Sequence, residues 1–237
     1  MPPSDSRPRA IVTGGGTGLG QASTKALLAA GFDVLSLGLD VEEEIDAPGY
    51  EHRSFDVTDS AAIAAVGAEF DRIDVLVNAA GIILHDNREM TNEGFAKVMQ
   101  VNLTGTQQMC FACETALGRV NGSVINFASM WTIFGSRGNP SYSASKGAVA
   151  SLTRSLAVAW GPKGIRVNAV APGWVATRMA TRAMNDPDRA GPILARIPMG
   201  RWGDPAEVGA VVAFLASPAA SYVTGAMLPI DGGYAVA

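Results

Sequence analysis

The feature that most limits how this chain can fold is a glycine-rich turn near its N-terminus. Five of the seven residues from 14 to 20 are glycine, and they follow a short apolar run, Arg9 to Thr13. A helical pattern from Gly20 to Ala30 comes next and stops at Gly31, a residue type favoured just past a helix end. Glycines let the backbone approach a ligand closely, and a helix N-terminus attracts phosphate. The turn therefore predicts a phosphate-binding crossover from strand to helix.

Strand-like and helical patterns alternate along the rest of the chain. This alternation is typical of a parallel sheet covered by helices on both faces, and the strands of such sheets are almost entirely apolar. The sequence predicts a single-domain Rossmann-type α/β fold, with a doubly wound sheet of about seven parallel strands flanked by helices. The expected strands are Arg9 to Thr13, Asp33 to Leu37, Glu51 to Phe55, Ile73 to Val77, Gly122 to Ala128, Ile165 to Ala171 and Met227 to Ile230. The expected helices are Gly20 to Ala30, Ser60 to Phe70, Glu93 to Leu117, Tyr142 to Trp160 and Asp204 to Ala216.

The length of 237 residues fits one domain of this kind. Residues 1–8 are predicted to be a flexible lead-in, and residues 9–237 to form one dinucleotide-binding and catalytic domain. The least regular stretch, around residues 175–203, carries several prolines and glycines. It is predicted to be a substrate lid, either mobile or built as an inserted pair of short helices.

Composition narrows the possible partners. The net charge of −4 argues against a nucleic-acid partner or an anionic membrane surface. The first nine residues are polar, so no secretory signal is expected, and no apolar run is long enough to span a membrane. Cys110 and Cys113 fall in a helical pattern without a second Cys or His pair, so they are predicted to be packing thiols. Free thiols suit a reducing cytoplasm, and no metal site is expected.

Tyr142 and Lys146 are four residues apart on an expected helix, so their side chains share one face. An adjacent ammonium favours the phenolate, which predicts a lowered tyrosine pKa and proton exchange with an alcohol near neutral pH. Such a pair also occurs on solvated helix faces, but the small residues from Ser141 to Ala148 favour close packing. Ser129 ends an expected strand, and the carboxyl ends of strands are where open α/β sheets bind ligands.

With these residues in place, the chain resembles the short-chain dehydrogenase/reductase family over essentially its whole length. The likeness extends to its sugar and sugar-acid dehydrogenases and its 3-oxoacyl reductases. One departure is Ala79, which replaces the second asparagine of the family's N-N-A-G. The matching motifs are T-G-x-x-x-G-x-G at Thr13 to Gly20, Asp56-Val57-Thr58, Asn78-Ala79-Ala80-Gly81, Val101-Asn102, Ser129, Tyr142-x-x-x-Lys146, Pro172-Gly173 and Asp231-Gly232-Gly233.

The resemblance implies a hydride transfer between a nicotinamide cofactor and a secondary alcohol or ketone. Tyr142 would be the general acid/base, and Lys146 would lower its pKa and bind the nicotinamide ribose. Ser129 would orient the substrate oxygen. Asn102 would hold a water in the proton relay, although its type and position also allow a helix cap.

The resemblance also implies where the cofactor lies. Asp56 would bind the adenine amino group, although a turn residue is the plain alternative for an aspartate here. Asn78 and Gly81 would line the adenosine ribose and stabilise the sheet, and Thr177 would touch the nicotinamide. The predicted cofactor residues are Gly14, Gly16, Thr17, Gly18, Leu19, Gly20, Gly38, Leu39, Asp40, Asp56, Val57, Asn78, Ala79, Gly81, Tyr142, Lys146, Pro172, Gly173, Val175 and Thr177.

The sequence favours NAD(H), with NADP(H) still possible. Relatives that use NAD commonly carry an acidic residue where Gly38 stands, and that residue is missing. However, residues 38–46 hold five acidic and no basic side chains, and Thr17 stands where NADP-preferring relatives often carry Arg or Lys. No cation for a 2′-phosphate is apparent in the neighbouring sequence. Asp40 is the expected acceptor of the ribose 2′-OH.

The substrate stays open between two classes. Trp131, Phe134 and Trp174 are predicted to form an apolar substrate wall or to be core aromatics, and His85 is expected at the surface on a loop that reaches the cleft. Apolar lid residues favour a hydrophobic or aryl ketone, and four lid arginines favour a carboxylate: Arg178, Arg182, Arg189 and Arg196. The alternatives are a reductase of 3-oxoacyl or aryl ketones using NADPH and a non-catalytic dinucleotide-binding regulator. The resemblance also implies a homotetramer.

Overall fold

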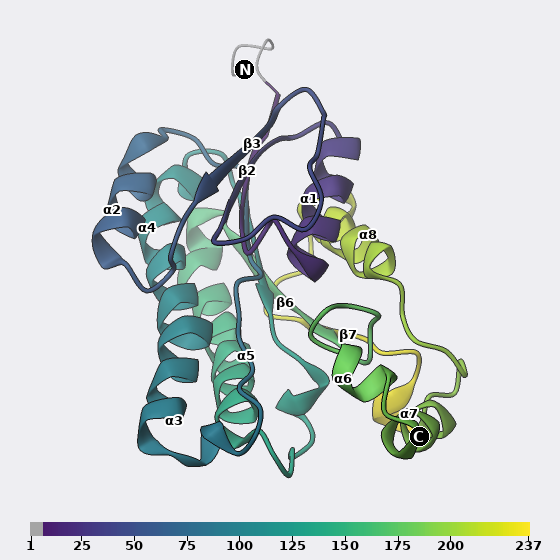
Figure 1. Ribbon diagram of the computed structural model, residues 1–237. Coiled ribbons are helices and arrows are strands. Elements are labelled where there is room, and N and C mark those ends of the chain that lie inside the picture. The colour runs from purple at the N-terminus through teal and green to yellow at the C-terminus, as the bar shows by residue number, and fades with distance from the viewer. Residues whose placement is uncertain (1–6) are drawn as a thin grey trace.

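The computed structural model describes residues 7–237, and its centre is a sheet of seven parallel strands in the order β3-β2-β1-β4-β5-β6-β7 (Figure 1). The predicted fold class is confirmed, and every expected strand is found with its ends within two residues. The predicted flexible lead-in lies outside the described residues except for its last two. The strands are β1 (Arg9–Thr13), β2 (Asp33–Gly38), β3 (Tyr50–Ser54), β4 (Val75–Asn78), β5 (Ser123–Phe127), β6 (Arg166–Pro172) and β7 (Met227–Ile230).

Helices cover both faces of the sheet, as Figure 1 shows, with α2, α4 and α5 on one face and α1 and α8 on the other. The helix expected from Glu93 to Leu117 is found as α3 and α4 joined by a π-helical turn, Gln100–Gly105. The helices are α1 (Gly18–Ala29), α2 (Ser60–Glu69), α3 (Asn92–Met99), α4 (Thr106–Gly118), α5 (Pro140–Trp160), α6 (Thr181–Met184), α7 (Pro187–Arg196) and α8 (Pro205–Ala216).

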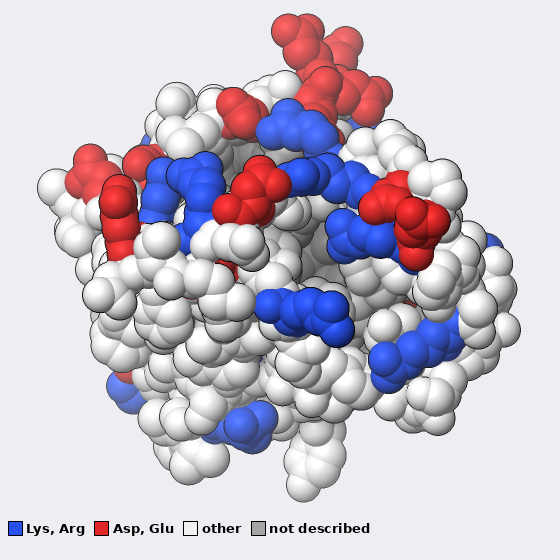
Figure 2. All heavy atoms as spheres, turned by 60° about the horizontal axis from the view of Figure 1, so that its bottom comes forward, with Lys and Arg blue, Asp and Glu red and all other residues white. Residues whose placement is uncertain are grey.

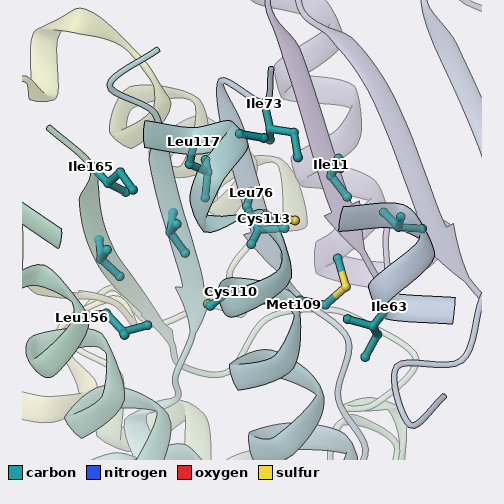
Figure 3. Packing of buried hydrophobic residues seen from close by; sticks show 14 of the residues in the cluster. Ile11, Ile63, Ile73, Leu76, Met109, Cys110, Cys113, Leu117, Leu156 and Ile165 are labelled. Atoms are coloured by element: carbon teal, nitrogen blue, oxygen red, sulfur yellow. The ribbon is translucent and has the colours of Figure 1, made fainter. Parts of the chain in front are cut away.

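The larger hydrophobic core lies between the sheet and the layer formed by α2, α4 and α5 (Figure 3). Ile11 and Leu76 enter it from the sheet, and Met109 and Leu117 enter it from α4, all fully buried. Cys110 and Cys113 point into the same core and are free thiols, so the predicted packing role is confirmed. Burial raises the pKa of both thiols, which keeps them protonated and unreactive.

The segment between β6 and α8 contains the two short helices α6 and α7, which agrees with one of the two interpretations of this stretch. Its ends lie side by side, because the Ala176 N–H donates to the Gly203 carbonyl and the Gly203 N–H donates to the Trp174 carbonyl, both at 2.9 Å. The segment is therefore anchored at its base. Its mobility as a lid stays a prediction. None of the helices within residues 7–237 combines the length and the apolarity needed to cross a membrane.

Candidate active site

The glycine-rich turn lies at the carboxyl end of β1, where the order of the strands reverses between β1 and β4. Ligands bind at this point in doubly wound sheets. A Cβ atom built on Gly14 would lie 2.8 Å from the Ala80 nitrogen, and one built on Gly16 would lie 2.2 Å from the Asp40 carbonyl oxygen. The turn therefore packs against two other segments predicted to bind the cofactor. Figure 2 turns this edge of the sheet toward the viewer and shows basic and acidic side chains side by side around a hollow.

Three positions of this turn favour glycine. A Cβ on Gly20 would lie 2.0 Å from the Gly14 carbonyl oxygen, and the backbone of Gly14 and Gly18 has positive φ angles of 67° and 47°. Thr177, from the start of the lid segment, lies on the other side, 3.9 Å from a Cβ built on Gly18. The turn is thus a cradle of backbone at the N-terminus of α1, with the shape and the N–H groups that a dinucleotide phosphate needs.

Lys146 and Asn102 meet beside Gly81, as the family pattern predicts. A Cβ on Gly81 would lie 3.5 Å from the Lys146 Nζ and 3.4 Å from the Asn102 Oδ1. The Lys146 Nζ donates to the Phe127 carbonyl oxygen at 2.7 Å, and it lies 5.6 Å from the centre of the Tyr142 ring. Burial lowers the pKa of Lys146 to about 8. The structure therefore brings the predicted lysine, tyrosine and asparagine together.

Asn102 does not cap a helix; it lies inside the π-helical turn between α3 and α4, fully buried. Its Oδ1 accepts from the Ile82 N–H at 2.8 Å, and its Nδ2 donates to the Ile82 carbonyl at 3.0 Å and to the Ser145 Oγ at 3.1 Å. The side chain is thus committed to holding the loop after β4. Its backbone carbonyl accepts from the Thr106 hydroxyl at 2.9 Å. A carbonyl has a second lone pair, so a relay water would bind there.

Lys146 is not among the groups that set the pKa of Tyr142 in this structure, so its predicted effect on that pKa stays a prediction. Burial raises the pKa of Tyr142 to about 12, while the neighbouring Ser129 hydroxyl lowers it and the charge of Glu89 raises it. The ammonium of Lys146 points to the Phe127 carbonyl and is not in contact with the phenol oxygen.

Two residues predicted to bind the cofactor serve other contacts. Asn78 is buried inside the sheet, and its Nδ2 donates to the Asn126 Oδ1 at 2.9 Å and to the Cys110 Sγ at 3.2 Å. This is the sheet-stabilising half of its expected role. Asp56 is exposed and accepts from the N–H and the hydroxyl of Thr58, both at 2.8 Å, which is the turn geometry of the alternative interpretation.

The acidic stretch after β2 lies against the glycine-rich turn. Two of its carboxylates pair with a cation from the lid segment. Asp40 and Glu42 lie 3.3 Å and 3.7 Å from the guanidinium of Arg178, in the lid segment. The neighbouring sequence offers no cation, but the fold supplies one, because Arg178 is distant from Asp40 in sequence and close to it in space. Glu42 also accepts from the Gly18 N–H at 2.8 Å. A carboxylate thus sits on an N–H group of the phosphate cradle.

The predicted aromatic wall is a packed cluster at the foot of the lid. Trp131 and Trp174 meet edge to face at 6.1 Å, and Phe134 meets Tyr234 at 6.0 Å. Arg196 lies over both Phe134 and Tyr234, with its guanidinium carbon 4.7 Å and 4.2 Å from the ring centres. Tyr234 is buried, whereas Trp131, Phe134 and Trp174 are only partly buried, so the cluster both packs and offers a surface.

A separate cavity of about 450 Å³ lies between the lid base and β7, lined among others by Trp174, Arg201 and Glu207. None of the four predicted catalytic side chains lines it. His85 is half-buried in the loop that faces the lid.

Three residues of the site could not be singled out from the sequence. Glu42 and Arg178 meet only in the folded chain. Glu89 is buried and accepts a hydrogen bond from the Tyr142 N–H at 2.9 Å, yet nothing in its local sequence separates it from the exposed Glu93 nearby.

Comparison with known proteins agrees with this geometry. A family model described as enoyl-(acyl carrier protein) reductase matches residues 14–235. The chain is 42% identical to galactitol 2-dehydrogenase (L-tagatose-forming) of Cereibacter sphaeroides over 96% of this chain and 94% of that protein. It is 39% identical to 2-dehydro-3-deoxy-D-gluconate 5-dehydrogenase of Bacillus subtilis (strain 168) over 95% and 93%. The solved Pseudomonas aeruginosa RhlG/NADP active-site complex has a TM-score of 0.87 at 34% identity, covering 97% of this chain and 96% of that one. The chain therefore belongs to the short-chain dehydrogenase/reductase family, as an oxidoreductase that uses a nicotinamide cofactor and acts on CH–OH groups.

Proposed function

We propose that this chain is a dehydrogenase of polyols or sugar acids that prefers NAD(H) and uses Tyr142 as its general acid/base. The observation that carries the proposal is the meeting of Tyr142, Lys146, Asn102 and Ser129 beside the glycine-rich cradle, at the carboxyl edge of the sheet. A protein that only binds a dinucleotide does not need a tyrosine next to a serine with a buried lysine close by.

The residues divide the chemistry between them. A bound nicotinamide ring would accept the hydride from the carbinol carbon. Tyr142 takes the hydroxyl proton of the alcohol, and Ser129 donates a hydrogen bond that fixes the same oxygen. Lys146 lies beside the Tyr142 ring, where its positive charge would stabilise the phenolate before the proton is transferred. The Asn102 side chain holds the loop at Ile82 beside the lysine. Its backbone carbonyl would accept a hydrogen bond from the water that carries the proton toward solvent.

The substrate class follows from the relatives and from the lid. Two relatives are named for the oxidation of a polyol and of a sugar acid. Arg196, over the rings of Phe134 and Tyr234, would present its charge to a substrate carboxylate or hydroxyls. We expect a panel of polyols, sugar acids, 3-oxoacyl thioesters and aryl ketones, followed by nicotinamide absorbance, to give the highest kcat/KM with a polyol or a sugar acid. A clear preference for a thioester or an aryl ketone with NADPH would favour the reductase alternative.

The preference for NAD(H) rests on the charge around Asp40. This site holds Asp40, Glu42 and Glu43 against Arg178 of the lid and Lys25, which pairs with Glu43, so a 2′-phosphate would still meet net negative charge. The relative solved with NADP shows that the family fold also accepts the phosphorylated cofactor. We expect kcat/KM to be higher with NAD⁺ than with NADP⁺, and the reverse order would contradict the charge argument.

Glu42 is expected to compete with the cofactor, because its carboxylate holds the Gly18 N–H of the phosphate cradle. A carboxylate at a helix N-terminus contributes up to about 1 kcal/mol, so Glu42→Ala should tighten binding of NADH and of ADP-ribose about fivefold. Titration calorimetry measures both ligands. Glu44→Ala is the matched control, because it removes the same charge from the same loop without touching the turn. Equal affinities of the two variants would show that Glu42 does not compete.

The remaining proposals concern the lid, the assembly and the compartment. We propose that residues 175–203 close over the substrate from their anchored base.

A homotetramer is supported by the apolar side chains that α4 and α5 expose, Phe111 at 53% and Val158 at 81%. Sedimentation equilibrium tests it, and a monomer at micromolar concentration would contradict it. The free buried cysteines support a reducing compartment such as the cytoplasm.

A further inference from the structure

Glu89 is a buried carboxylate beside the candidate active site, with 1% of its surface exposed. Its Oε1 accepts from the Leu84 N–H at 2.9 Å and from the Asn139 Nδ2 at 3.2 Å, and its Oε2 accepts from the Tyr142 N–H at 2.9 Å. Within residues 7–237, no ion pair of Glu89 is found. A buried carboxylate is costly unless hydrogen bonds satisfy it, and here three donors from the loop after β4 and the start of α5 do so.

These contacts make Glu89 the cap of the catalytic helix. Helix α5 begins at Pro140, so Tyr142 is its third residue, and the N–H of a third residue normally bonds to the side chain of the cap. The residue at the cap position, Asn139, makes no such bond, and the first turn of α5 contains no acidic residue. Glu89 supplies the missing acceptor and the missing negative charge from 53 residues earlier in the chain.

The same carboxylate joins the tyrosine to the loop that Asn102 holds. Asn102 fixes this loop at Ile82, and Glu89 fixes it at Leu84. Asn139 completes the connection by donating to the Leu84 carbonyl at 2.9 Å. The backbone that carries the phenol and the backbone beside Lys146 are therefore held in one hydrogen-bonded unit.

We propose that Glu89 is a positioning residue for Tyr142: its carboxylate fixes the start of α5 so that the phenol oxygen meets Ser129 and the substrate. This inference rests on the proposed function of Tyr142 as the general acid/base. Glu89 touches neither substrate nor cofactor in this account and acts only through the tyrosine.

The charge of Glu89 should affect the pH–rate profile, which a purely structural role of this residue would not change. Burial raises the pKa of the Tyr142 phenol, the Ser129 hydroxyl lowers it and the negative charge of Glu89 raises it, while Lys146 lies 5.6 Å from the ring. Removing the charge of Glu89 should therefore lower the pKa of Tyr142. In the direction of alcohol oxidation the phenolate is the base, so the rising limb of the pH–rate profile should move to lower pH.

The test compares Glu89→Gln with Asp59→Asn. Asp59 caps α2 by accepting from the Ala61 and Ala62 N–H groups, so D59N removes the charge of a cap outside the catalytic helix and keeps an acceptor oxygen. We expect E89Q to lower kcat about tenfold, to keep the cofactor KM within twofold, and to move the rising limb down by about half a pH unit or more. D59N should keep the kcat and the pH–rate profile of the unchanged protein. If E89Q does not fold, Glu89→Asp keeps the charge while shortening its reach, and it should lower kcat without moving the limb.

A second readout needs no turnover. The protein has four tyrosines, so carbon-13 labelling of the phenol carbon gives four resonances in an NMR spectrum. The resonance that is missing in Tyr142→Phe belongs to Tyr142. E89Q should lower the titration midpoint of that resonance. An unmoved midpoint, or a kcat loss equal to that of D59N, would overturn the proposal. The midpoint is measured without substrate, so it separates a failure of this inference from a failure of Tyr142 as the acid/base.

Discussion

Tyr142→Phe is expected to lower kcat by about 10³-fold or more while leaving the cofactor Kd within twofold. General acid–base catalysis contributes about 10²- to 10⁴-fold, and the phenol oxygen is the group that this account assigns to the proton. The ring of Tyr142 stays in place in the variant, so the packing around Lys146 and Ser129 should be kept. Stopped-flow measurement of cofactor reduction, together with calorimetric titration of NADH, separates chemistry from binding.

Tyr222→Phe is the control for the loss of a tyrosine hydroxyl, because Tyr222 is fully exposed. Its kcat should match that of the unchanged protein. A Tyr142→Phe variant that keeps near-normal kcat would remove the tyrosine from the mechanism. A variant that loses cofactor affinity instead would mean that the phenol serves binding and not proton transfer.

Gly20→Ala is expected to weaken cofactor binding at least tenfold and to lower the free energy of unfolding by about 2 kcal/mol. The added methyl group would lie 2.0 Å from the Gly14 carbonyl oxygen, which is backbone and cannot rotate away. Either the turn opens or α1 moves off the sheet, and both changes displace the N–H groups of the cradle. Calorimetric titration with NADH and thermal unfolding measure the two effects.

Gly161→Ala is the matched control for this change. Gly161 lies at the end of α5 with φ −50° and ψ −45°, and a Cβ there would meet nothing within 4 Å. Because Gly161 precedes Pro162, an alanine in this helical conformation should bring no gain in stability, but it should leave the cofactor affinity unchanged. Cofactor affinity that is the same in Gly20→Ala and Gly161→Ala would contradict the assignment of the turn as the phosphate cradle.

The fold was predictable because short stretches of sequence determine its strands and helices. Apolar runs and helical periods alternate at the spacing of a parallel sheet, and single residues end or begin the helices. The helix expected from Asp204 begins as α8 at Pro205, with a full capping box formed by Asp204 and Glu207. The helix expected from Ser60 begins there as α2, with Asp59 as its cap.

The catalytic set was predictable for a different reason. Ser129, Tyr142 and Lys146 stand at family spacings, and the parallel strands bring the segments that carry them to one edge of the sheet. What spacing could not predict was the electrostatic state of the tyrosine. That state depends on burial and on where the Lys146 ammonium points, and both are properties of the folded chain.

The residues that modify the site were not predictable from local sequence. Arg178 reaches Asp40 across 138 positions, and Glu89 reaches the Tyr142 backbone across 53. Glutamate and arginine are common surface residues, so neither pattern nor composition distinguishes these two from the rest. Their roles follow from contacts between distant segments, which only the structure supplies.

The most direct test of the central claim is the transfer of an isotopic label. The best alcohol of the substrate panel, deuterated at the carbinol carbon, is incubated with NAD⁺ and the protein, and the reduced nicotinamide is analysed by mass spectrometry. We expect the deuterium in the reduced nicotinamide, at a rate that falls about 10³-fold or more in Tyr142→Phe. Cofactor that binds but is not reduced by any alcohol of the panel would contradict the account, as would reduced nicotinamide without the label.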